Sequence, residues 1–154
     1  MVVVTVLAIL ATLAVPSMRD MLIATQVRAA ASDLFESVIL ARSEAIKRGG
    51  NVAIVPASSG WASGWSVVAA ATTTAAAATI ETRDAATNVT ITPNTTGNVT
   101  YRLDGRILST SVRSLTLSTT AASSPVAARC VVIDASGRAS IKTDTDNNPA
   151  NGCN

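Results

Sequence analysis

The chain has 154 residues and a mass of 15.6 kDa, which suits one domain of ordinary size or a small domain with an appendage. Hydrophobic residues make up 48% and charged residues 14%, which excludes a disordered chain, and the net charge of +2 is too small to indicate a nucleic-acid or acidic-lipid partner by itself. The absence of histidine excludes Ser-His-Asp catalysis, Cys-His catalysis and His-ligated metal sites, and two cysteines are too few for a Cys-rich zinc site.

The first segment, residues 1–18, carries no charge. As a helix it would span roughly 27 Å, close to the thickness of a bilayer core. No basic residue precedes the apolar run, as one would in a cleaved signal peptide. We therefore expect this segment to insert into a membrane or to pack in a helical assembly. A buried core helix is the alternative.

Residues 19–49 continue the helix as an amphipathic one. Pro16 removes one backbone hydrogen bond and is expected to loosen the helix locally. Apolar residues then recur at alternating spacings of four and three, and they are Val27, Ala31, Leu34, Val38, Ala41 and Ala45. Glu44 and Arg48 are spaced as an exposed pair, and Gly49-Gly50 is a plausible stop. The pattern predicts one helix from about Met1 to Arg48, on the order of 70 Å long.

Residues 50–154 have the texture of a β-rich domain. Asp104-Gly105 is a hairpin candidate, and the Ala/Thr tract Ala69–Thr79 favours a long loop or an edge. The β-prone runs are Val52–Val55, Trp65–Val68, Ile80–Arg83, Val89–Thr92, Val99–Leu103, Leu115–Ser118, Cys130–Ile133 and Ala139–Lys142. Trp61 and Trp65 are predicted to pack within this domain, and a contact surface at its tip is the alternative.

The two cysteines suggest a fastened tail. Cys130 opens a β-prone run and Cys153 is the penultimate residue. In an oxidising compartment a disulfide between them would contribute roughly 3 kcal/mol in the chain-entropy model. Two free thiols in a cytosolic protein are the alternative, but the apolar N-terminal segment favours an exported chain and therefore the disulfide.

Several motifs resemble one protein family. The opening Met1-Val2-Val3-Val4 resembles the stretch just after the GFTLIE-type motif of type IV pilins, whose glutamate this chain does not contain, and Pro16 matches a proline of those proteins. The segment Leu40–Arg48 (LARSEAIKR) is similar to a segment of the FimT/GspH family of minor pilins and pseudopilins. The pairs Gly60-Trp61 and Gly64-Trp65 resemble the GW element of that family, and Asp134–Arg138 (DASGR) resembles its late turn.

The resemblance implies an α+β fold in which a long N-terminal helix packs on a C-terminal antiparallel β-sandwich. It implies a membrane or filament-core helix over 1–18, an amphipathic continuation over 19–49 and a periplasmic head over 50–154. The expected assembly residues are Val4, Leu7, Leu10, Leu13 and Pro16.

The implied function is that of a non-enzymatic subunit that helps to initiate or cap a type IV pilus or a type II secretion pseudopilus. Its partners would be other pilins and the inner membrane, which it would cross once. The resemblance implies no cofactor, no metal and no small-molecule substrate.

A DNA-binding minor pilin is the second reading. The segment 101–142 holds six basic residues against two acidic ones, a local charge of +4. The six basic residues are Arg102, Arg106, Arg113, Arg129, Arg138 and Lys142. Some FimT-like proteins bind DNA through a late Gly-Arg-x-Arg turn, of which only Arg138 matches here. Arg106, Arg138 and Lys142 are the candidate DNA contacts, and scattered solvated arginines are the alternative.

Two further patterns predict no chemistry. Asp144-x-Asp146-x-Asn148 has the opening spacing of a calcium loop, but Pro149 stands where that loop needs glycine, so we interpret it as a polar turn. Ser43 and Lys47 have the spacing of a Ser/Lys dyad, but they belong to an exposed stripe.

Overall fold

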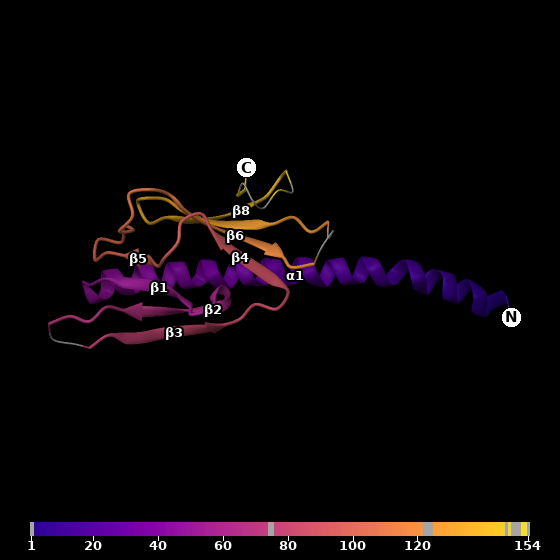
Figure 1. The fold of residues 1–154 in the computed structure, drawn as a ribbon, viewed down its shortest axis with the longest axis horizontal. Helices are drawn as coiled ribbons and strands as arrows, with labels where there is room; N and C mark the ends of the chain where they lie inside the picture. Colours follow the sequence, from indigo (N-terminus) through magenta and orange to yellow (C-terminus); the bar gives the residue numbers. More distant parts are fainter. Residues whose placement is uncertain (1, 74–75, 122–124, 147, 149–151, 154) are drawn as a thin grey trace.

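The structure is a computed structural model, which describes residues 2–73, 76–121, 125–146, 148 and 152–153. It gives the backbone but not the side chains of residues 2 and 4–17. One helix, α1 (Val2–Arg48), runs along the longest axis of the molecule. Its N-terminal part extends beyond the β-rich domain, and its C-terminal part lies within that domain (Figure 1).

The end of α1 shows why the helix stops where the sequence predicts. Gly49 has a φ of +60°, a conformation that costs glycine little. The N–H of Gly50 donates to the carbonyl of Ala45 at 3.2 Å, and that of Gly49 donates to Ile46 at 3.3 Å. This is the Schellman arrangement, which satisfies carbonyls left open at a helix C-terminus.

Eight strands follow within the described residues, one at each β-prone run of the sequence. They are β1 (Val52–Ala57), β2 (Gly60–Ala69), β3 (Ala78–Asp84), β4 (Val89–Pro93), β5 (Val99–Tyr101), β6 (Arg113–Thr119), β7 (Arg129–Ile133) and β8 (Ala139–Thr143). The run Val99–Leu103 forms a shorter strand than expected because the chain turns after Tyr101. The Ala/Thr tract ends β2, connects it to β3 and begins the edge strand β3, as predicted.

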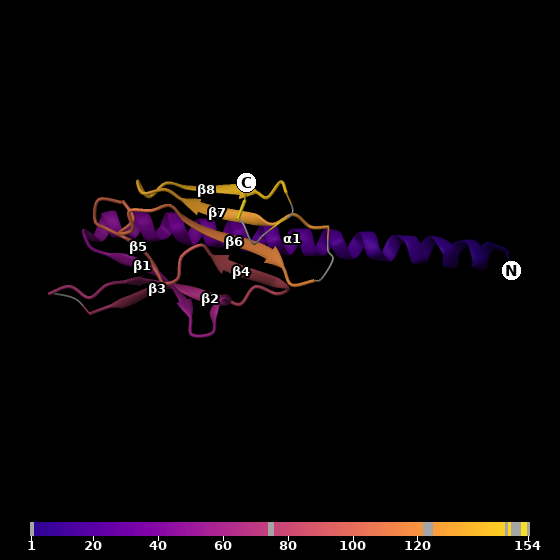
Figure 2. The same cartoon turned by 45° about the horizontal axis from the view of Figure 1, so that its top comes forward.

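The strands form two four-stranded antiparallel sheets. Sheet A has the order β3-β2-β1-β5, and sheet B has the order β4-β6-β7-β8. Helix α1 contacts strands of both sheets. In Figure 1, β2 and β3 of sheet A lie below the helix and β6 and β8 of sheet B lie above it, and Figure 2 shows strands of sheet B passing across the helix. The expected long helix on antiparallel β-sheets is confirmed, with the helix built into the core that both sheets share.

Alternation along the strands determines which side chains enter the core. In sheet A, Val52 pairs with Ala69 and Tyr101, and Ile54 pairs with Val67 and Val99. All of these side chains are buried. In sheet B the buried face carries Ile91, Leu115, Leu117, Val131 and Ile133. The predicted helical stripe meets both faces, and all six of its residues are buried. Every second residue of the strands and the stripe that repeats every 3.6 residues along the helix therefore face one shared core.

Candidate functional site

The first candidate functional element is the N-terminal part of α1 from Val2 to Leu22, which we call the stem. The predicted assembly residues Val4, Leu7, Leu10, Leu13 and Pro16 have side chains outside the described part of the structure. Just beyond them, Met18, Met21 and Leu22 are each more than 60% exposed. No helix among the described residues has the length and apolar character needed to cross a membrane. Met18, Met21 and Leu22 therefore offer an apolar helical surface that the head does not cover.

A buried polar bridge fixes α1 to sheet A. The indole N–H of Trp65 donates to the hydroxyl of Ser37 at 3.0 Å, and that hydroxyl donates to Glu81 at 3.1 Å. Arg83 pairs with Glu81 at 2.8 Å and reaches Asp33 on the helix at 3.5 Å. The predicted packing role of the tryptophans is confirmed, because Trp61 and Trp65 are 5% and 3% exposed. Ser37 was not predicted from the sequence, although its place three residues after Leu34 lies on the buried side of the helix.

The charged residues at the end of α1 differ from their expected arrangement. Glu44 is not part of an exposed pair, because its side chain is only 12% exposed and accepts hydrogen bonds from both Arg48 at 2.6 Å and Lys47 at 3.3 Å. The Arg48 hydrogen bond, above all, lowers the pKa of Glu44. Ser43 instead donates to the carbonyl of Leu40, so Ser43 and Lys47 form no dyad.

Two turns touch at the end of the head that lies farthest from the stem. In the first turn, the expected reversal at Asp104-Gly105 is confirmed, since the N–H of Arg102 donates to Arg106 at 2.8 Å. The return forms a single bridge, Tyr101 to Ile107, rather than a second strand.

The second turn, 134–138, packs directly on the first. A Cβ on Gly137 would collide with the carbonyl oxygen of Gly105. The hydroxyl of Tyr101 donates to the carbonyl of Gly137 at 3.2 Å, and burial raises the pKa of that hydroxyl. The hydroxyl of Ser136 and the N–H of Arg138 donate to Asp134 and lower its pKa.

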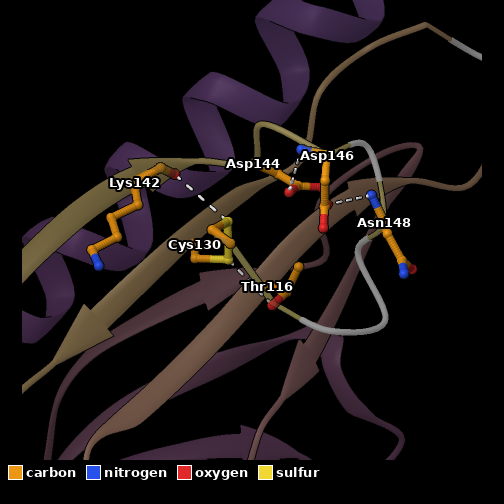
Figure 3. Close-up of a disulfide and its surroundings, with 7 residues drawn as sticks. Thr116, Cys130, Lys142, Asp144, Asp146 and Asn148 are labelled. Carbon is orange, nitrogen blue, oxygen red and sulfur yellow. Dashed lines mark hydrogen bonds between the residues drawn. A yellow bond between two sulfur atoms is a disulfide. The ribbon is translucent and has the colours of Figure 1, made fainter.

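The touching turns bring some of the predicted DNA contacts together and leave others apart. Arg106 and Arg138 are exposed on adjacent turns. Lys142 is exposed near the other end of β8, opposite Cys130 and close to the disulfide (Figure 3). Arg113 is only 7% exposed, so it does not contribute to a basic face. Its register with Leu115 and Leu117 could have indicated this from the sequence.

The disulfide between Cys130 and Cys153 is present and fastens the C-terminal tail to sheet B, with a Cα–Cα distance of 5.9 Å. Cys130 lies on the face of β7 that points away from α1, and the Thr116 hydroxyl lies 3.3 Å from its sulfur (Figure 3). Thr116, Cys130 and Asp144 are all at least nine-tenths buried. The outer face of sheet B is therefore covered where the tail returns.

The turn that follows β8 contains the motif interpreted as polar. Asp144 accepts from the N–H of Asp146 at 3.4 Å, and Asp146 accepts from that of Asn148 at 2.9 Å. Burial and the neighbouring Asp146 carboxylate raise the pKa of Asp144. Among the described residues, no three Asp, Glu, His or Cys side chains converge as metal ligands would.

Comparison with known proteins finds one matching family and several similar structures. The family model described as type II transport protein GspH matches residues 30–137. The minor pilin FimU of Pseudomonas aeruginosa has a similar structure, with a TM-score of 0.64 and 19% identity over 80% of this chain and 92% of that one. The minor pseudopilin EpsH of the Vibrio cholerae type 2 secretion system gives 0.61 and 9% identity over 77% and 97%. No curated protein sequence matches the chain.

Proposed function

Because the chain belongs to the GspH family of type II transport proteins, we propose that it is a non-catalytic structural subunit of a type II secretion pseudopilus or a type IV pilus. The family match carries this proposal, and the pilin-like fold supports it. The uncovered stem of α1 provides the surface through which such a subunit joins its neighbours.

The proposed route of assembly follows from the apolar N-terminal residues. Before assembly, residues 1–18 lie in the inner membrane and the head lies in the periplasm. During assembly, these residues pack against the stems of other subunits. The disulfide between Cys130 and Cys153 supports a compartment outside the cytoplasm, because disulfides persist in oxidising surroundings. As a minor subunit, the protein initiates or caps the filament instead of forming its length.

A deletion strain tests this function, with pilus display and protein secretion both measured. We expect one of the two to fall, and the one that falls identifies the filament. Complementation with Leu10→Lys is expected to fail because a charge enters the assembly segment. Ser32→Lys introduces the same charge on an exposed face of the same helix and is expected to complement. Normal piliation and secretion in the deletion strain would contradict the proposal.

DNA binding is the second candidate function, favoured by one observation. The contact between Gly105 and Gly137 joins the two distal turns, and the residues that follow these glycines, Arg106 and Arg138, are both exposed, so that one phosphate backbone could contact both. Lys142 would extend this surface only along β8.

Gel-shift titration with duplex DNA at two salt concentrations tests this candidate. Arg106→Gln and Arg138→Gln are each expected to weaken binding and to reduce the salt slope by about one. Arg28→Gln, an exposed arginine on α1, is the matched control and should have no effect. Unchanged binding in both turn variants would exclude this surface.

A further inference from the structure

Arg113 is a buried cation without a carboxylate partner. It begins β6 and is 7% exposed. Its Nη2 atom donates to the carbonyl oxygens of Gly97 and Asn98, each at 3.2 Å. Every ion pair found in the described part of the chain involves Glu44 or Arg83, so none reaches Arg113. Buried guanidinium groups are normally paired, because the loss of hydration is costly.

The remaining donors of Arg113 open into a pocket. Its Nε and Nη1 atoms have no hydrogen-bond partner, yet the only fully buried and unpartnered nitrogen or oxygen of the described side chains is Oδ2 of Asp144. Solvent therefore reaches these nitrogens, although the residue as a whole is more than nine-tenths buried. Arg113 lines a pocket of about 250 Å³. The pocket provides the opening through which its free N–H groups can be approached.

Arg113 is the single charged residue among the described residues that line this pocket. It lies beside the edge strand β5 and the segment 107–113 that returns along it. The other lining residues are Asn98, Val99, Thr100, Ile107, Leu108 and Ser109. They add an amide, two hydroxyl groups and apolar walls but no second charge. Leu108 is 60% exposed and offers an apolar contact at this site.

We propose that this pocket binds the carboxylate of an aspartate or glutamate side chain presented by another protein chain, with Arg113 as its charge partner. Because Nη2 is already bonded to two carbonyl oxygens, a carboxylate in the pocket would accept a charge-assisted N–H···O bond from Nε or Nη1. The volume accommodates one acidic side chain, and the lone charge neutralises one carboxylate rather than a run of phosphates. In an assembled filament, a neighbouring subunit supplies this acidic side chain. Only this identification of the partner rests on the proposed function.

Nuclear magnetic resonance of the full chain in detergent micelles tests the pocket without requiring assembly. The Nε–Hε signal of Arg113 is followed during titration with the α-amide of N-acetylglutamate at constant ionic strength. We expect a saturable shift, and a response at least about tenfold weaker to the α-amide of N-acetylglutamine, which has no carboxylate. No shift, or equal shifts with both probes, would overturn the proposal.

Two variants keep the test specific. Thr100→Phe fills the pocket from the outward face of β5 and leaves Arg113 in place, so it should remove the response while the rest of the spectrum stays native. Arg113→Lys retains the charge without the planar guanidinium and should bind more weakly than the wild type, as measured from the backbone N–H signals of Asn98 and Thr100. A response that survives Thr100→Phe would overturn the site. A stronger Arg113 shift with inorganic phosphate or an oligonucleotide would replace the carboxylate with a phosphate ligand.

Discussion

Ser37 shows how one hydroxyl joins two elements of secondary structure. It accepts from Trp65 and donates to Glu81, and it is completely buried. Ser37→Ala leaves the indole N–H without an acceptor and should lower the free energy of unfolding by about 1–3 kcal/mol. Urea unfolding followed by tryptophan fluorescence measures this loss. Ser32→Ala, on the exposed face of the same helix, is the control, and equal effects of both changes would show that the bridge contributes nothing.

Asp144 and Asp134 are expected to respond to pH in opposite directions. The pKa of Asp144 is raised by burial, so the folded state binds a proton more readily than the unfolded state. The stability contributed through Asp144 should therefore rise as the pH falls toward the pKa of the unfolded chain. The pKa of Asp134 is lowered by Ser136 and Arg138, so its contribution should be lost as the pH falls through the folded value.

Unfolding experiments between about pH 3 and pH 7 on two variants measure these contributions. At neutral pH, Asp144→Asn should be at least as stable as the wild type. It should lack the increase in stability that the wild type gains through Asp144 as the pH falls. Asp134→Asn should be less stable at neutral pH and should match the wild type at low pH. The same sign of change in both variants would contradict the assignment.

At the residue scale the sequence predicted apolar positions better than polar ones. The six-residue stripe of α1 could be read from spacing alone, because burial of apolar side chains repeats with the helical period. Ser37, Glu44 and Arg113 could not be placed in this way. Each is buried because of partners that are distant in sequence or lie on the next helical turn, and the hydrophobic pattern does not record such partners.

At the scale of elements, the disulfide determines the position of the C-terminal tail. Cys153→Ala releases the loop that is closed on β7 and should cost about 3 kcal/mol in the chain-entropy model. Thermal or urea unfolding of the variant, beside wild-type protein with and without reductant, measures the loss. Reduced wild type should resemble the variant. A variant as stable as the oxidised protein would show that the tail is held by its other contacts.

The strands were predicted in place, but their order was not. Alternating residues and turn signals mark where each strand lies, as at Val89–Pro93 and Asp104-Gly105. Strand order depends on pairings across long stretches of chain. Strand β5 pairs with β1, and β4 joins β6 in the other sheet. Local sequence patterns cannot distinguish the correct partner strand from other strands with the same alternation of apolar and polar residues.

At the scale of the whole molecule, one core joins the helix and both sheets. Leu34 is completely buried within it, and Leu34→Ala should lower the free energy of unfolding by about 2–5 kcal/mol. Circular dichroism of the helix and fluorescence of Trp61 and Trp65 should report one shared transition. Ile39→Ala, at a half-exposed position on the same helix, is the control and should have a much smaller effect. Two separate transitions would show that the helix and sheets unfold independently.

The course of α1 through the head has a mechanical consequence. A pull on the stem acts along the helix axis, and the buried stripe from Val27 to Ala45 lies along that axis against both sheets. Such a load would act as shear on many side-chain contacts at once instead of peeling one turn away after another. The subunit is therefore built to resist extraction when tension is applied through its own stem.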